Sequence, residues 1–186
     1  MIALADAIRD GTIRNAEIAV VLSDKATAPG LHLAAERGLT TAAIERKGRN
    51  REQHELEIIS TLRSHEVDLI CLAGYMRLLS PCFIDAFPGR ILNIHPSLLP
   101  AFPGLDAQRQ ALDHGVKVTG CTVHFVDNTL DGGPIIAQRV VPVMDDDTEE
   151  TLGGRILEQE HRLYSEALRM VLQGKLRIVG RRVIET

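Results

Sequence analysis

The sequence predicts an α/β fold with a doubly wound, mostly parallel sheet, helices on both faces and an antiparallel strand pair in the C-terminal half. Short apolar runs alternate with segments of helical periodicity from residue 2 to residue 94, which is the pattern of successive βαβ units. Two further apolar runs, at 119–127 and 134–143, are separated only by a short loop, as in a hairpin. A long helical pattern, at about 148–172, follows them.

The individual elements follow from their spacing and their end signals. Residues 2–10 place Ile2, Leu4 and Ile8 at helical intervals, and Gly11 is a plausible end of that helix. The β-branched run at 17–23 is typical of a buried parallel strand. After it we expect a helix at 30–38, a strand at 40–45, a helix at 51–65, a strand at 68–74, a short helix at 81–86 and a strand at 90–94. The proline-containing segment 97–115 is expected to be a loop.

Length and composition bound the class of protein. With 186 residues, 45% of them hydrophobic, the chain is expected to form one domain, residues 1–186, that buries roughly two-thirds of its unfolded surface. A net charge of -4 with scattered basic residues argues against a nucleic-acid partner. No long apolar run and no signal-peptide pattern is present, which favours a cytoplasmic protein without a membrane partner. The three cysteines lack a C-x-x-C pair, so they indicate neither a disulfide framework nor a zinc site.

Asn93 and His95 are the first candidate functional residues. They lie two positions apart on the strand at 90–94, so both side chains face the same way. Pro96 cannot continue a strand ladder and places His95 at the carboxyl end of the strand, where open parallel sheets bind ligands. Pro100 and Pro103 restrict the loop that follows. A histidine that merely caps a strand end is the structural alternative.

Asp131 adds a carboxylate to this pair. It stands just before Gly132 and Gly133, which permit a tight turn. If the hairpin folds back beside the strand at 90–94, Asp131 can approach His95 and favour its imidazolium form, while Asn93 donates to an oxygen that gains negative charge. Direct transfer of a carbonyl group between two ligands fits this set best.

Two other kinds of chemistry remain open for the same segment. Ser97 is the nearest candidate for a covalent nucleophile, but no serine or cysteine is placed to complete a covalent mechanism. His95, His124 and Asp131 could serve as metal ligands, although they form no compact ligand motif. We therefore expect no metal.

Five motifs, in this order, resemble the phosphoribosylglycinamide formyltransferases (glycinamide ribonucleotide transformylases). They are GYMRLLS (74–80), ILNIHPSLLPAFPG (91–104), RQAL (109–112), TVHFVDNTLDGGPII (122–136) and EQEH (158–161). The joint presence of N-x-H-P-S-L-L-P and L-D-G-G-P is the most specific part. The resemblance covers nearly the whole chain and implies the formyltransferase fold. It also implies transfer of a formyl group from 10-formyltetrahydrofolate to the amino group of glycinamide ribonucleotide, in de novo purine biosynthesis. The implied catalytic residues are Asn93, His95 and Asp131.

The resemblance also implies the residues that bind the two small-molecule substrates. Arg51 corresponds to a basic residue that meets the glutamate tail of the folate, although a solvated arginine at a helix start is an alternative. The first stretch lines the pteridine pocket and consists of Met76, Arg77, Leu78 and Leu79. The second forms another wall of that pocket and consists of Asp127, Asn128, Thr129, Leu130 and Asp131. The third holds the glycinamide end of the nucleotide and consists of Leu157, Glu158, Gln159 and Glu160. Ordinary core packing and a charged helix surface are the alternatives for the first and the third stretch. A homodimer is left open.

The chain departs from the family pattern at two places. Members usually begin with an apolar strand and a glycine-rich phosphate loop, whereas Met1 falls where the first helix should already be under way. We expect an N-terminally truncated domain whose two strands next to the missing one have unpaired edges. In addition, some members carry histidines where this chain has Asp106 and Gln108.

Three alternative functions are weighed against formyl transfer to the nucleotide. A folate-binding remnant without catalysis would follow from the absent phosphate loop. Formyltetrahydrofolate hydrolases tend to show His-His-Ser-Phe where this chain has His95, Pro96, Ser97 and Leu98. Methionyl-tRNA formyltransferases usually have an arginine soon after S-L-L-P, whereas residues 101–104 here are Ala-Phe-Pro-Gly.

Overall fold

Side-chain caps define where the two longest helices begin in the computed structural model, which describes residues 1–186. Thr148 and Thr151 form a reciprocal capping box at the start of α6 (Glu149–Leu172). Asn50 and Gln53 form the same arrangement at α3 (Arg51–Ser64). The other helices are α1 (Ile2–Arg9), α2 (Pro29–Glu36), α4 (Pro81–Ala86) and α5 (Ala107–Asp113). The helices predicted at 2–10, 30–38, 51–65, 81–86 and 148–172 are therefore confirmed.

The strands form two sheets. β1 (Val21–Ser23) pairs in parallel with β2 (Thr41–Ala43). The larger sheet has the order β3-β4-β5-β6-β8-β7 and consists of β3 (Ile70–Leu72), β4 (Ile91–His95), β5 (Val118–Phe125), β6 (Ile135–Pro142), β7 (Leu176–Val179) and β8 (Arg182–Glu185). β3 pairs with β4 in parallel, and β5 pairs with both β4 and β6 in antiparallel fashion. The predicted hairpin thus folds back beside β4.

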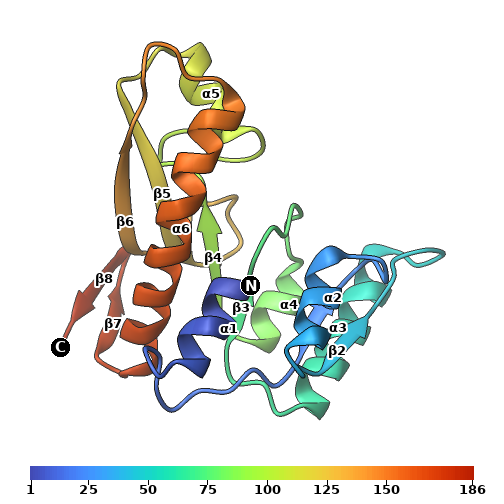
Figure 1. Cartoon of the computed structure of the whole chain (residues 1–186). Coiled ribbons are helices and arrows are strands. Elements are labelled where there is room, and N and C mark those ends of the chain that lie inside the picture. The colour runs from blue at the N-terminus through green and yellow to red at the C-terminus, as the bar shows by residue number, and fades with distance from the viewer.

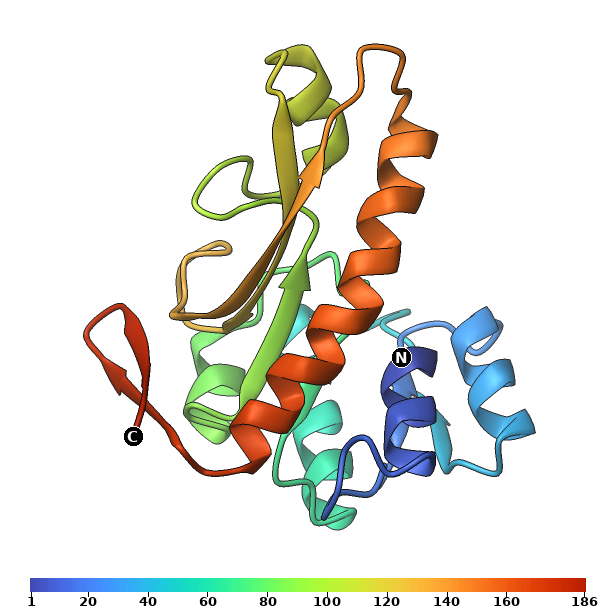
Figure 2. The same ribbon diagram turned by 60° about the vertical axis from the view of Figure 1, so that its left-hand side comes forward.

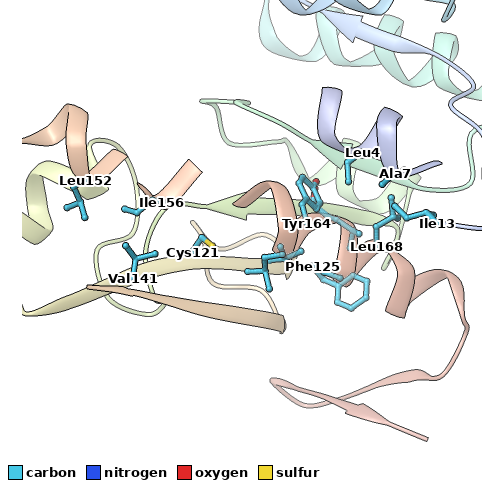
Figure 3. Close-up of a cluster of buried hydrophobic side chains, with 14 residues drawn as sticks. Leu4, Ala7, Ile13, Cys121, Phe125, Val141, Leu152, Ile156, Tyr164 and Leu168 are labelled. Atoms are coloured by element: carbon cyan, nitrogen blue, oxygen red, sulfur yellow. The ribbon is translucent and has the colours of Figure 1, made fainter. Parts of the chain in front are cut away.

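The main core lies between α6 and the larger sheet. Figures 1 and 3 show α6 running along β5 and β6, with Leu152, Ile156, Val141 and Cys121 between them. α1 packs on the other end of α6 through Leu4 and other apolar side chains. The hydroxyl of Tyr164 lies 2.9 Å from the carbonyl oxygen of Leu72 and 3.1 Å from that of Leu92, so α6 is also tied to β3 and β4. This packing holds β4 and β5, the strands that carry the candidate site.

A second, smaller core lies where α3 and α4 meet the β3–β4 edge. Its buried residues are Ile59, Leu62, Ile70, Leu79, Phe83, Phe87 and Ile91. Between this part of the molecule and α1 is an apolar groove of about 1250 Å³. The groove is lined by both sheet edges, 20–24 from β1 and 70–73 from β3. The strands beside the groove are each paired on one side only, as expected.

Two features of the chain were not predicted from the sequence. The segment 97–115, expected as a loop, contains α5, whose N-cap residue Asp106 has a left-handed conformation with φ +55°. The C-terminal residues form the β7–β8 hairpin, in which β8 pairs with β6 (Figure 2). The helix is short and follows a Pro-Gly pair, and the hairpin is mostly exposed, so neither has a strong apolar pattern.

Candidate active site

Asn93 and His95 lie at the carboxyl end of β4, immediately before Pro96. β4 is covered by β3 on one side and by β5 on the other, and the register places Asn93 opposite His124 and His95 opposite Thr122. His95 is buried, with 5% of its surface exposed. The period of two in the strand therefore brings both side chains to one place, as predicted.

The ring of His95 is held between two hydrogen-bond acceptors. Its Nε2 donates to the carbonyl oxygen of Phe102 over 2.8 Å. Its Nδ1 lies 3.4 Å from Oδ2 of Asp131. The same Oδ2 accepts the backbone N–H of Gly104 over 2.8 Å, which fixes the carboxylate against the proline-containing loop. The predicted approach of Asp131 to His95 is present.

The conformation of the 127–133 turn places Asp131. Asp127 accepts hydrogen bonds from the backbone N–H and the hydroxyl of Thr129, forming a local turn. Asp131 itself has a positive φ of +46°. A Cβ on Gly133 would lie 1.9 Å from the carbonyl oxygen of Phe125, so only glycine permits this close return of the chain to β5.

His124 completes the cluster and was missed as a functional residue, since the sequence suggested it only as a metal ligand. Its Nδ1 donates to the carbonyl oxygen of Phe125 over 2.9 Å, so its Nε2 is free to accept. Nδ2 of Asn93 lies 3.3 Å from that Nε2, and Oδ1 of Asp131 lies 3.9 Å from it. Burial lowers the pKa of His124, although the charge of Asp131 acts in the opposite direction. Only the strand register, which the sequence does not give, reveals that His124 faces Asn93.

The hydroxyl of Ser97 is used inside the loop. Ser97 is fully buried, and its Oγ donates to the carbonyl oxygen of Ala101 over 2.5 Å. Thr122 donates to the carbonyl oxygen of Ser97 and accepts the N–H of Leu99, which ties the loop to β5. This arrangement does not favour Ser97 as a nucleophile. No group of three or more His, Cys, Asp and Glu side chains is arranged to hold a metal ion.

The stretch Met76–Leu79 lies in the loop between β3 and α4. Met76 and Leu78 are exposed, whereas Leu79 belongs to the second core. Arg77 forms an ion pair of 2.6 Å with Asp24, which follows β1. The loop is thus anchored while two apolar side chains remain available to a ligand. In the 127–131 turn, Asn128 and Thr129 are exposed, Asp127 is partly buried, and 53% of Leu130 is exposed.

Arg51 and the predicted glycinamide-binding stretch lie on α3 and α6. Arg51 is the first residue of α3 and is half-exposed, with its Nε 3.3 Å from Oε1 of Glu55. Leu157 and Glu158 are exposed on α6, and Gln159 and Glu160 are partly buried. Burial raises the pKa of the Glu160 carboxyl, and the amino group of Met1 opposes that rise. No helix of the structure is both long and apolar enough to cross a membrane.

Comparisons with known proteins identify the family to which this chain is similar. A family model described as formyl transferase matches residues 1–168. The chain is 46% identical over 159 residues to phosphoribosylglycinamide formyltransferase of Bacillus subtilis (strain 168), covering 85% of this chain and 82% of the relative. It is 47% identical over 180 residues to the trifunctional purine biosynthetic protein adenosine-3 of Drosophila pseudoobscura pseudoobscura. That match covers 96% of this chain but only 13% of the relative's length.

A solved structure has the same fold over nearly the whole chain. The crystal structure of glycinamide ribonucleotide transformylase 1 from Symbiobacterium toebii superposes with a TM-score of 0.96 at 52% sequence identity. The match covers 98% of this chain and 86% of that chain. The chain therefore belongs to the formyl transferase family, and within it to the phosphoribosylglycinamide formyltransferases.

Proposed function

We propose that this chain transfers the formyl group of 10-formyltetrahydrofolate to the amino group of glycinamide ribonucleotide, in de novo purine biosynthesis. One observation carries the proposal: Asn93 and His95 at the end of β4 meet Asp131 from a turn 36 residues farther along, with His95 Nδ1 3.4 Å from the carboxylate. Family membership and the names of the relatives support the choice of reaction.

The three side chains have complementary roles in this reaction. The amine of the nucleotide attacks the formyl carbon, and the carbonyl oxygen becomes an oxyanion. Asn93 uses one amide N–H to reach His124 and has a second N–H to donate to that oxyanion. The N–H groups of an imidazolium would both find acceptors at His95, because Phe102 and Asp131 face its two nitrogens.

The reaction then needs a proton at the leaving nitrogen. The bond between the amine and the formyl carbon forms, and the bond between that carbon and N10 of the folate breaks. N10 gains a proton while the attacking amine loses one. His95, whose Nδ1 lies 3.4 Å from Oδ2 of Asp131, is the group we assign to this proton transfer. No covalent intermediate with the protein is required, which agrees with the internal hydrogen bond of Ser97.

We assign the substrates to the residues that the family resemblance implies. Met76 to Leu79 and the 127–131 turn border the pteridine, and the guanidinium of Arg51 meets the glutamate tail. Leu157 to Glu160 hold the glycinamide end of the nucleotide. We further propose that residues 1–186 act as one domain on these two small molecules in the cytoplasm.

The proposal is tested by measuring folate binding and formyl transfer separately. Binding of tetrahydrofolate is followed by calorimetry, and transfer is followed with 10-formyltetrahydrofolate in the presence and absence of glycinamide ribonucleotide. We expect formylated nucleotide to accumulate with the acceptor present, and little free formate without it. Formate release that does not depend on the nucleotide would instead support a formyltetrahydrofolate hydrolase.

A second protein separates an enzyme from a folate-binding remnant. It carries an additional apolar strand and a glycine-rich loop joined before Met1. Binding without transfer by residues 1–186, with transfer restored by the extension, would assign the phosphate contacts to the added loop. Failure of both proteins to bind tetrahydrofolate would overturn the proposal.

A further inference from the structure

Glu55 is a buried carboxylate outside the catalytic cluster, on the second turn of α3. Only 3% of it is exposed. Its Oε1 and Oε2 lie 3.1 and 3.2 Å from the backbone N of Ser80, which donates to them. Its Oε1 is also 3.3 Å from Nε of Arg51. One buried carboxylate therefore joins α3 to Ser80, 25 residues farther along, at the end of the β3–α4 loop.

A buried carboxylate is costly unless it is paired and hydrogen-bonded, so this position needs its two partners. Ser80 is the N-cap of α4, and its own Oγ accepts the N–H of Phe83. The Asn50 and Gln53 capping box begins α3 at Arg51, so Arg51 and Glu55 lie one turn apart on the same side of the helix. The end of the 73–80 loop is thus attached to α3, and the capping box defines where α3 begins.

We propose that Glu55 is a positioning residue for the folate: it sets the end of the 73–80 loop through the Ser80 N–H and holds the Arg51 guanidinium through Nε. This inference rests on the proposed function, since Met76 to Leu79 and Arg51 are there assigned to the pteridine and to the glutamate tail. Arg51 forms no second ion pair, so its terminal nitrogens are available to a ligand carboxylate. Glu55 itself touches no substrate.

The loop residue Tyr75 is also affected by the charge of Glu55. Burial raises the pKa of Tyr75, and the charge of Glu55 raises it further. Tyr75 also packs against the second core. The charge of Glu55 therefore acts on the loop itself as well as on Arg51.

The first test compares Glu55→Gln with the matched control Glu57→Gln. Glu57 lies on the same helix, and its side chain is 45% exposed and pairs with Arg49. Glutamine has one acceptor oxygen and no charge, so Glu55→Gln should raise the dissociation constant for tetrahydrofolate about tenfold, as expected for a lost charge-assisted hydrogen bond. Affinity for glycinamide ribonucleotide and kcat should stay within about twofold. Glu57→Gln should match the unmodified protein in all three quantities.

The second test asks whether Glu55 acts through the Ser80 N–H. Ser80→Pro removes this N–H at a residue whose φ of -74° suits proline, and Ser80→Ala keeps the N–H but removes the hydroxyl. Ser80→Pro should weaken tetrahydrofolate binding more than Ser80→Ala. Adding Glu55→Gln to Ser80→Pro should weaken binding by much less than it does alone. If Glu55→Gln raises the dissociation constant by the same factor in the Ser80→Pro protein as in the unmodified protein, Glu55 does not act through Ser80.

A spectroscopic measurement shows whether the charge of Glu55 acts on the 73–80 loop. The chain has two tyrosines, and burial raises the pKa of Tyr164 well above that of an ordinary phenol. The first phenolate to form on raising the pH therefore belongs to Tyr75, and Glu55→Gln should shift its titration to lower pH.

The outcomes of these tests are distinct. An unshifted tyrosine titration together with unchanged folate affinity in Glu55→Gln would overturn the inference while the proposed function stands. A uniform loss of affinity for folate and nucleotide would also overturn it, because that indicates general destabilisation. If the unmodified protein does not bind tetrahydrofolate, the proposed function fails first.

Discussion

At the scale of single residues, the chemistry of the site depends on which nitrogen atoms carry protons. His95 faces two acceptors, the carbonyl oxygen of Phe102 and the carboxylate of Asp131. His124 faces one acceptor, the carbonyl oxygen of Phe125, and one amide donor, Asn93. The first arrangement offers an acceptor to each ring nitrogen, and the second requires Nε2 to accept and therefore suits a neutral ring. Two histidines on neighbouring strands therefore take different roles because their partners differ.

Replacing His95 tests its role in proton transfer. His95→Ala should lower kcat by about a hundredfold or more, since general acid–base groups typically contribute that much. Tetrahydrofolate affinity should change by only a few-fold, because the folate is assigned to other residues. His32→Ala, on a histidine whose side chain is 77% exposed, is the control and should leave both quantities unchanged. A large loss of affinity with intact turnover would contradict the assigned role.

The pH dependence of stability tests the neutral state of His124. Its pKa is lowered by burial in the folded protein, whereas in the unfolded chain it is near 6.5. Below about pH 6.5 the unfolded chain binds more protons at this residue, so stability falls as the pH decreases toward the folded pKa. The contribution of one group is at most about 1.4 kcal/mol per pH unit.

The measurement is the free energy of unfolding by urea at pH 7.5 and pH 5.5. His124→Gln should lose less of this free energy between the two pH values than the unmodified protein does, and His32→Gln should lose as much as the unmodified protein. Equal pH slopes for His124→Gln and the unmodified protein would show that His124 is not held neutral in the fold. In the unmodified protein kcat should also fall on the acid side, because a protonated His124 cannot accept from Asn93.

The sequence predicts the members of this cluster better than it predicts their arrangement. The alternation of side chains along a strand is enough to put Asn93 and His95 on one face, and the Gly132–Gly133 pair is enough to mark the turn that carries Asp131. The partner of Asn93 depends on the β4–β5 register, which results from tertiary packing. His124 could therefore be identified only in three dimensions.

At the scale of elements, the close return of the 127–133 turn to β5 positions the carboxylate. Gly133→Ala would place a Cβ 1.9 Å from the carbonyl oxygen of Phe125, so the turn must move. We expect a loss of stability of about 1–3 kcal/mol, as for overpacked sites, and a fall in kcat as Asp131 leaves His95. Thermal unfolding and steady-state kinetics measure the two effects.

A second glycine in a different setting is the control for this variant. Gly154 lies inside α6, and a Cβ there meets nothing within 4 Å. Gly154→Ala should leave kcat unchanged and raise stability by about 0.5–1 kcal/mol, because alanine is favoured over glycine within a helix. If Gly133→Ala behaved like Gly154→Ala, the close return of the turn would have no part in placing Asp131.

Elements with strong local signals are also the ones that the sequence predicts well. The capping box at Thr148 and the apolar stripe behind it define α6 within a residue of its predicted limits. α5 has only seven residues, and its start depends on a left-handed Asp106. The β7–β8 hairpin is held largely by its own pairing and by one contact with β6. Short elements that depend on tertiary neighbours leave little pattern in the sequence.

At the scale of the whole molecule, two cores share one sheet edge. The main core follows α6, and the second core follows α3 and α4, with β3 and β4 contributing to their common boundary. The groove lies between β1 and β3, and α1 also borders it. Few apolar contacts cross a groove, so this side of the molecule should open at a lower free energy than the main core.

The three cysteines lie at increasing depth: on the surface, at the groove-facing side of the main core, and in its interior. Cys82 is exposed on α4, Cys71 lies on β3 in the lining of the groove, and Cys121 is fully buried in the main core. Burial raises the pKa of Cys71 to about 11 and that of Cys121 to about 12, so neither is an appreciable thiolate at pH 8 while the protein is closed. Cys121 can react only when the main core opens, whereas Cys71 is partly exposed and is slowed by its small thiolate fraction.

Alkylation with iodoacetamide at pH 8, followed by mass spectrometry of the peptides, gives the rate at each thiol. We expect Cys82 to react first, Cys71 at an intermediate rate and Cys121 only at the rate of global unfolding, because opening the groove exposes β3 without separating α6 from β5. Low concentrations of urea should accelerate Cys121 more than Cys71, since a larger surface is exposed when the main core opens. A Cys82→Ser variant removes the fast reaction and serves as the background for the other two. Equal rates and equal urea dependence at Cys71 and Cys121 would show that β3 beside the groove and the interior of the main core open as one unit, and the groove would then be no boundary in the folding of this protein.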